Sequence, residues 1–278
     1  MKNFLVRVAT GLIFGIVLIG SMWLGKTSFG ILFLLVTMLS VREFCTLVAE
    51  HKNTTFNKWL AVLGGGYLFA AFYAVFHAGA ENALLVFLPY IALVLFMFIQ
   101  QVFATNGSKL DNLAYFTLSQ VYAALPFAML NILATAGAGA GDTYSFILPL
   151  CIFIFIWCND TGAFCVGCTI GRHKMFERVS PKKTWEGFAG GAIVAMGAGV
   201  ALSYIWDIMN VWEWTGMAAT VVATATLGDL IESCMKREMQ IKDSGTLLPG
   251  HGGVLDRFDS TILATPSVIL YLTLIGLI

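Results

Sequence analysis

Nine stretches of predominantly apolar residues dominate the sequence, and each has roughly the 20 residues that a helix needs to cross a bilayer core. They lie at residues 8–25, 28–48, 59–77, 83–104, 112–135, 144–166, 187–206, 214–233 and 260–278. Such stretches fold as helices, because backbone polar groups cannot stay unpaired in lipid. We therefore expect an all-α, polytopic integral membrane protein with about nine transmembrane helices.

The overall composition excludes an ordinary soluble domain. Apolar residues make up 58% of the chain and charged residues 12%, whereas soluble domains have roughly 45–50% and 25%. The 16 Lys and Arg residues balance the 16 Asp and Glu residues. Since a neutral chain has no bulk attraction to a polyanion, we expect no nucleic-acid partner.

The distribution of basic residues predicts the orientation of the chain. Cytoplasmic loops of membrane proteins accumulate Lys and Arg. With the N-terminus in the cytoplasm, every Lys and Arg except Lys26 falls in an inner segment. We therefore predict a cytoplasmic N-terminus in the cytoplasmic membrane, with the polar loops 167–186 and 234–259 on the cytoplasmic face.

The polar loops concentrate in the second half of the chain. We expect residues 1–135 to supply the first five transmembrane helices, and residues 136–278 to supply helices six to nine together with both polar loops. The two parts would form one integrated membrane domain. Because the first span lacks the order of segments typical of a signal peptide, we expect it to be retained.

A ridge of small residues predicts close helix packing in the seventh span. Small side chains recur there at every fourth position, which lets two backbones approach closely in lipid. We expect the ridge to pack inside the subunit, with a dimer face as the alternative. Its members are Gly187, Gly191, Ala195, Gly199 and Ser203.

Two acids within apolar spans are candidate functional residues. An ionised carboxylate at the centre of a membrane helix costs about 2.5–3.5 kcal/mol, so Asp160 and Asp229 need a reason to be there. A structural pairing with a loop cation or a helix terminus is the alternative. If the eighth helix extends beyond the membrane, Asp229, Glu232 or Ser233, and Lys236 share one face. A solvated helix end is the alternative for this stripe.

Two cytoplasmic segments predict a site for anions and a metal ion. Residues 242–259 are rich in charge and glycine, and glycine lets backbone N–H groups approach an anion while carboxylates can hold Mg²⁺. In the other segment, Ser180 as N-cap and Pro181 at the first helical position predict a helix start. That start would present N–H groups, Lys182 and Lys183 to an anion. Contact of the two lysines with lipid headgroups is the alternative.

The cysteines do not indicate a metal centre. Cys165 and Cys168 have the spacing of a metal-binding pair, but no second Cys or His pair with comparable spacing follows. We therefore expect these residues to serve helix packing.

The C-terminal half carries one long composite pattern. It reads Ser233-x-x-Lys236-Arg237, then Lys242-Asp243, then His251-Gly252-Gly253-x-x-Asp256-Arg257-x-Asp259. Upstream lie Asp160-Thr161-Gly162-Ala163-Phe164, Ser180-Pro181-Lys182-Lys183-Thr184-x-Glu186-Gly187 and Gly228-Asp229. This combination resembles the signature of the phosphatidate cytidylyltransferase family, also called CDP-diacylglycerol synthases. The N-terminal half resembles that family only in its hydrophobicity.

The resemblance implies a homodimeric membrane enzyme that uses Mg²⁺ to convert CTP and phosphatidate to CDP-diacylglycerol and pyrophosphate; a second cation is left open. Acids at the positions of Asp229 and Asp256 bind the metal in the family, and Asp160 and Asp259 are further candidate ligands. Asp229, Asp256 and Lys236 are the expected catalytic residues. The residues expected to bind substrate are Ser180, Lys182, Lys183, Thr184, Ser233, Arg237, Lys242, Asp243, His251, Gly252, Gly253 and Arg257.

The two expected substrates belong to different phases. CTP dissolves in the cytosol, whereas the acyl chains of phosphatidate cannot leave the bilayer without exposing CH₂ groups at about 0.8 kcal/mol each. We therefore expect a site that faces the cytoplasm at headgroup level. Since the lipid phosphate is already ionised, the reaction needs no general base, and we expect His251 to contact phosphate or the loop.

Other functions are compatible with parts of the pattern. A polyprenol kinase or an ether-lipid cytidylyltransferase would also combine CTP with a membrane lipid. An ion-coupled transporter would account for acids within apolar helices, but it has no evident need for the charged, glycine-rich cytoplasmic loop.

Overall fold

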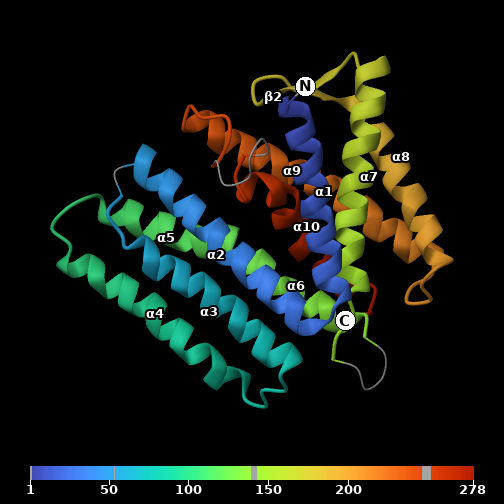
Figure 1. Cartoon of the computed structure of the whole chain (residues 1–278). Helices are drawn as coiled ribbons and strands as arrows, with labels where there is room; N and C mark the ends of the chain where they lie inside the picture. Colours follow the sequence, from blue (N-terminus) through green and yellow to red (C-terminus); the bar gives the residue numbers. More distant parts are fainter. Residues whose placement is uncertain (1, 53, 139–142, 246–251) are drawn as a thin grey trace. The chain divides into compact units, whose positions relative to one another are not determined.

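The protein is described by a computed structural model that covers residues 2–52, 54–138, 143–245 and 252–278. These residues form ten helices and one short two-stranded sheet (Figure 1). The elements are α1 (Lys2–Trp23), α2 (Lys26–His51), α3 (Lys58–His77), α4 (Ala83–Phe103), α5 (Lys109–Ala123), α6 (Leu125–Ala136), α7 (Ile147–Ile170), β1 (Lys174–Phe176), β2 (Ser180–Thr184), α8 (Trp185–Ser203), α9 (Val211–Glu238) and α10 (Leu255–Leu274).

The helical architecture confirms the expected fold class. Each of the nine predicted spans overlaps a helix, and the span 112–135 consists of α5 and α6, which meet at Ala124 just before Pro126. Seven segments of the described residues are long and apolar enough to cross a membrane: α2, α3, α4, α5 with α6, α7, α8 and α9. The protein is thus an all-α polytopic membrane protein. Nine spans and a cytoplasmic N-terminus stay predictions.

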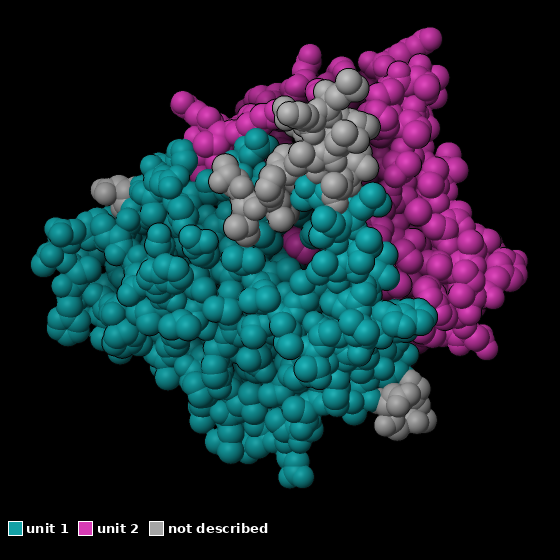
Figure 2. Space-filling model, viewed as in Figure 1, with its two compact units in different colours: residues 1–146, 243–257 teal, residues 147–242, 258–278 magenta. Residues whose placement is uncertain are grey.

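The chain divides into two compact units (Figure 2). Unit 1 comprises residues 1–146 and 243–257, and unit 2 comprises residues 147–242 and 258–278. The glycine-rich loop therefore folds with the N-terminal helices, although it lies far from them in the sequence.

In unit 1, α2 packs along α3, and α3 also contacts α4, α5 and α6. Close approach is possible at Gly65, where an added Cβ would lie 2.8 Å from Val41 Cγ2 and 3.1 Å from Ala124 Cβ. Helix α4 buries only Met97 and Gln101 in the described residues. Its remaining apolar surface suits contact with lipid.

In unit 2, glycines let α8 pack closely against α7 and α9. A Cβ on Gly191 would lie 2.6 Å from the Asn159 carbonyl oxygen, and one on Gly199 would lie 3.0 Å from the Trp214 carbonyl oxygen. Both contacts are within the subunit, so the ridge of small residues packs inside it, as expected. The buried members are Gly187, Gly191, Ala195 and Gly199.

The predicted helix start at Ser180 is wrong. Residues 180–184 form strand β2, which pairs antiparallel with β1 in the register Phe176 to Ser180 and Lys174 to Thr184. Thr184 is the N-cap of α8, and its hydroxyl accepts a 3.2 Å hydrogen bond from the Gly187 N–H. Pairing with β1 keeps Ser180 extended, and the cap that starts the helix comes four residues later.

The glycine contacts of α8 predict which substitutions it tolerates. Gly191→Val would force side-chain atoms into the Asn159 backbone, so α7 and α8 would separate and the unfolding temperature would fall by several degrees. Gly197→Val is the matched control, because a Cβ there meets no atom within 4 Å. Thermal unfolding of both purified variants in detergent tests this. Equal unfolding temperatures would contradict the packing described for α8.

Candidate functional site

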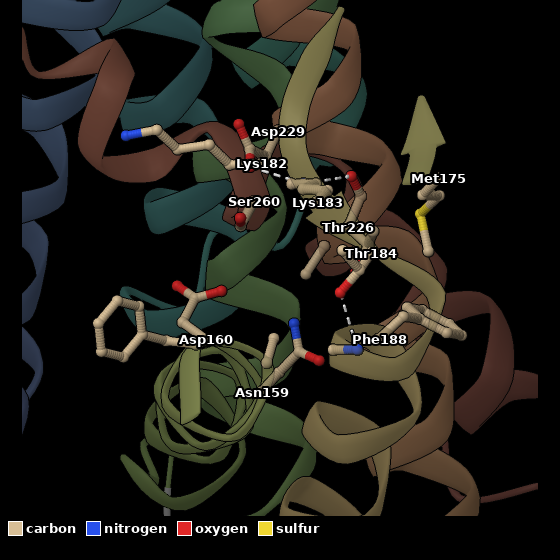
Figure 3. Close-up of a pocket in the computed structure, with 14 residues that line it drawn as sticks. Asn159, Asp160, Met175, Lys182, Lys183, Thr184, Phe188, Thr226, Asp229 and Ser260 are labelled. Carbon is tan, nitrogen blue, oxygen red and sulfur yellow. Dashed lines mark hydrogen bonds and ion pairs between the residues drawn. The ribbon is translucent and has the colours of Figure 1, made fainter. Parts of the chain in front are cut away.

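A pocket in unit 2 collects residues from six elements: α7, β1, β2, α8, α9 and α10 (Figure 3). Asp160 lines it from α7, Lys182 and Lys183 from β2, Asp229 from α9 and Ser260 from α10. Its walls therefore combine two acids, two lysines and a hydroxyl. Several of these residues were predicted to form one site from segments far apart in the sequence.

Lys183 and Asp229 form an ion pair across the pocket. The Lys183 Nζ lies 2.7 Å from Asp229 Oδ2 and also donates a 3.3 Å hydrogen bond to the Thr226 carbonyl oxygen (Figure 3). The two side chains are 25% and 35% exposed, so solvent screens the pair and it contributes about 1 kcal/mol or less to stability. Such a pair can exchange partners when an anion or a cation enters.

Asp229 of this ion pair also belongs to a cluster of three acids. Carboxylate oxygens of Asp229, Glu232 and Asp259 lie within 4.8 Å of one another. Glu232 is buried, and its Oε2 accepts a 2.9 Å hydrogen bond from Lys236 Nζ within an ion pair. Ser233 Oγ donates to Asp229 Oδ1 over 3.3 Å. The predicted stripe on α9 is thus confirmed, because the helix continues to Glu238.

Close approach of α9 and α10 at Gly228 brings these acids together. A Cβ on Gly228 would lie 2.6 Å from the Asp259 carbonyl oxygen. Any larger residue would push α10 away at the point where Asp259 faces Asp229. The Gly228-Asp229 pair in the sequence therefore has a direct structural reason.

The electrostatics of the cluster favour a bound cation. Asp259 precedes the predicted span 260–278, and its burial, together with the neighbouring Asp229 and Glu232 carboxylates, raises its pKa well above the ordinary value. Two lysines offset part of the negative charge. A divalent cation would stabilise the ionised form of all three acids, and an all-oxygen donor set is the kind that Mg²⁺ and Ca²⁺ prefer. The residues present therefore fit such an ion.

The remaining predicted residues of unit 2 surround the pocket or end the helix. Thr184 lines the pocket while capping α8, and Lys182 is exposed. Arg237 is exposed near the end of α9 and donates to the Ile241 carbonyl oxygen over 3.4 Å. Ser180 is half-buried in β2, and Lys242 is exposed.

Other predicted residues belong to unit 1. Asp243 and Arg257 are exposed, and Gly253 is buried. Asp256 Oδ2 accepts 2.8 Å hydrogen bonds from the N–H groups of Ser244 and Gly253, so this carboxylate holds two parts of the loop together. A further predicted residue, His251, lies outside the described residues.

Gly252 has a conformational role beside Asp256. Its φ is +81°, and a Cβ there would lie 2.5 Å from Asp256 Oδ2. Only glycine combines this backbone angle with such close approach to the carboxylate.

Sequence reasoning missed two acids. Glu232 was placed on the stripe but not among the ligands, although it lies three residues after Asp229. Glu43 was overlooked, although it lies within the apolar span 28–48 and contacts the loop through Ser244 and Val254. The rule that singled out Asp160 and Asp229, an acid within a membrane helix, would have found Glu43 as well.

Fold and site together define a class: a polytopic α-helical membrane protein with an acid cluster and lysines around one pocket. A family model described as "Cytidylyltransferase family" matches residues 5–275. The chain belongs to the cytidylyltransferase family. The matched range includes the N-terminal half, which resembled the family only in its hydrophobicity.

Two curated relatives carry the same name. A protein of Bacillus subtilis (strain 168), named phosphatidate cytidylyltransferase, is 30% identical over 271 residues, which cover 96% of this chain and 97% of the relative. A protein of the same name from Staphylococcus aureus (strain COL) is 45% identical over 115 residues, or 41% of this chain and 44% of the relative. The chain thus spans less than half the length of the S. aureus relative in that alignment.

The acid cluster predicts a specific effect of removing one charge. Mg²⁺ should raise the unfolding temperature of the protein, because an ion that binds only the folded state stabilises it. Glu232→Gln keeps the shape of the side chain but removes a carboxylate oxygen, so this stabilisation should largely disappear. Glu238→Gln, at an exposed position of the same helix, should keep it. An undiminished effect of Mg²⁺ on Glu232→Gln would contradict the cation site.

Proposed function

We propose that the protein is a phosphatidate cytidylyltransferase, which forms CDP-diacylglycerol and pyrophosphate from CTP and phosphatidate. The observation that carries this proposal is the acid cluster of Asp229, Glu232 and Asp259 beside Lys183 and Lys236, in a chain of the cytidylyltransferase family. The name of the B. subtilis relative, which aligns over nearly its whole length, supports the choice of substrates.

The chemistry requires neutralisation of negative charge. An oxygen of the lipid phosphate forms a bond to the α-phosphorus of CTP, and the bond from that phosphorus to the β-phosphate bridge breaks, releasing pyrophosphate. Both reactants are anions, so they repel each other until positive charge lies between them. When bound, Mg²⁺ supplies Lewis-acid charge neutralisation at the phosphates. Asp229, Glu232 and Asp259 would hold it, and a second cation stays open.

The basic residues have complementary tasks. Lys183 and Lys236 each pair with an acid of the cluster, so their ammonium groups lie where phosphate oxygens would arrive. Lys182, Arg237, Lys242 and Arg257 are exposed and are suited to the triphosphate or the lipid headgroup. These groups orient and neutralise the reactants rather than transfer protons, since phosphoryl transfer relies on positioning and charge stabilisation.

We propose Asp256 and Asp160 as further participants in metal binding. For Asp256 the support is the resemblance of the pattern His251-Gly252-Gly253-x-x-Asp256-Arg257-x-Asp259 to the family signature. Asp160 lines the same pocket as Asp229 from α7 (Figure 3). The described residues of the loop, including Asp243, Gly252 and Gly253, would contact substrate through backbone N–H groups or charge.

The basic end of α9 indicates which side of the membrane the site faces. The acid-bearing helix α9 is long and apolar enough to span a bilayer, and its last turn carries Lys236 and Arg237. Basic residues at a helix end are typical of the cytoplasmic side. We therefore propose a site that faces the cytoplasm in the cytoplasmic membrane, in a homodimeric protein.

The assay of choice uses purified protein, labelled CTP, phosphatidate vesicles and Mg²⁺. CDP-diacylglycerol and pyrophosphate should form, and chelation of the metal should abolish them. Asp229→Asn should lower turnover about a hundredfold or more, because charge stabilisation at the transition state is lost. Asp256→Asn should have a similar effect. Asp207→Asn, at an exposed position before α9, is the control and should keep normal turnover.

The products separate the alternatives. Release of CDP with a phosphorylated lipid would indicate a polyprenol kinase, and pyrophosphate release only with an ether-linked lipid would indicate an ether-lipid cytidylyltransferase. Flux of a solute into proteoliposomes without nucleotide turnover would indicate an ion-coupled transporter. Near-normal turnover of Asp229→Asn would reject the role given to this acid.

A further inference from the structure

Glu43 is an acid in the second half of an apolar helix, and the proposed chemistry does not use it. It lies on α2, which is long and apolar enough to cross a membrane. Its carboxylate is directed at the glycine-rich loop, two hundred residues further along the chain. Glu43 Oε2 accepts a 2.8 Å hydrogen bond from the Val254 N–H, and Glu43 Oε1 accepts one from the Ser244 hydroxyl.

These contacts reach both described parts of the loop. Ser244 lies just after Asp243, whereas Val254 lies directly before α10. Ser244 and Val254 are 3% and 5% exposed, so their polar groups depend on protein partners rather than water. Removing the Glu43 acceptor leaves these donors unsatisfied, which favours opening of the loop.

Glu43 and Asp256 both accept hydrogen bonds from Ser244. The Ser244 hydroxyl donates to Glu43, while the Ser244 N–H donates to Asp256 Oδ2 over 2.8 Å. The Gly253 N–H also donates to Asp256 Oδ2, and the next residue, Val254, donates to Glu43. The two carboxylates thus accept hydrogen bonds at the same two places in the loop: at Ser244, and at the neighbouring residues Gly253 and Val254. The groups that orient Asp256 are therefore held in place by Glu43.

Two glycines leave room for the Glu43 carboxylate. A Cβ on Gly253 would collide with Glu43 Oε1, and one on Gly245 would lie 2.9 Å from Glu43 Cδ. Glycine at these positions is therefore needed for the Glu43 carboxylate to approach the loop backbone. The contact with Glu43 on α2 therefore explains why the signature has glycine at position 253.

We propose that Glu43 is a positioning residue, which fixes the loop that carries Asp256 by accepting hydrogen bonds from Ser244 and Val254. This inference rests on the proposed function for its catalytic consequence. The positioning itself is a property of unit 1 alone, since Glu43, Ser244, Val254 and Asp256 all belong to that unit.

Hydrogen–deuterium exchange of the full-length protein in detergent, without substrates, tests the positioning directly. In Glu43→Ala, peptides that contain Val254 should exchange about tenfold faster than in the parent protein, because the Val254 N–H has lost its acceptor. Peptides that contain Ser244 should also exchange faster, because the hydroxyl contact that holds this residue against Asp256 is gone. Glu50→Ala is the matched control, since Glu50 is exposed at the end of the same helix. It should leave exchange in these peptides unchanged. Equal exchange in Glu43→Ala and Glu50→Ala would overturn the proposal.

Two milder variants keep the test decisive if Glu43→Ala does not yield monodisperse protein. Glu43→Gln keeps the size of the side chain and one acceptor oxygen, so it should give an intermediate increase in exchange. Ser244→Ala removes the hydroxyl contact but leaves the Val254 contact, so exchange should rise near Ser244 more than near Val254. Parent-like exchange in both variants would also overturn the proposal.

Kinetics connect positioning to catalysis. If Asp256 helps to hold the cation, Glu43→Ala should raise the Mg²⁺ concentration needed for half-maximal turnover about tenfold, and Glu43→Gln should restore part of it. Glu50→Ala should leave this concentration unchanged. A parent protein without CDP-diacylglycerol formation would refute the proposed function, while exchange would still report on Glu43. An active parent with an unchanged Mg²⁺ requirement in Glu43→Ala would refute the catalytic link.

Discussion

Like-charge repulsion among three clustered carboxylates is the interaction on which the site depends. Three acids from α9 and α10 lie within 4.8 Å of one another, and each ionised pair at such distances raises the energy of the others. The fold maintains this arrangement through backbone contact at Gly228 and through charge compensation by Lys183 and Lys236. A site built in this way is suited to a divalent cation, and a cation so placed is suited to polyphosphate.

The proposed substrates place the reaction at a membrane surface. In the proposed reaction, one reactant is a soluble nucleotide and the other cannot leave the bilayer. Helix α9 is apolar over most of its length, and its last turns carry Glu232, Lys236 and Arg237. One continuous helix therefore carries the charged groups out of the apolar region. Small residues on α8 allow close packing with α7, which contributes Asp160 to the pocket.

The fold was predictable from the sequence because hydrophobicity in lipid is a strong, local signal. The stripe on α9 was also predictable, since helical periodicity alone places Asp229 and Lys236 on one face. The start of α8 was not, because Ser180 is a good local cap and only pairing with β1 keeps it extended. Glu232 and Glu43 depend on contacts with distant segments, and a single sequence does not show which segments meet.

The most direct test of the central claim uses Mn²⁺ in place of Mg²⁺, because its unpaired electrons report on nearby phosphorus. Pulsed electron–nuclear double resonance of the purified protein with Mn²⁺ and CTP should show ³¹P coupling to the bound ion. Asp229→Asn should lose both tight Mn²⁺ binding and the coupling. Coupling of equal strength in Asp229→Asn would contradict the account, since the cation would then be held without the acid on α9.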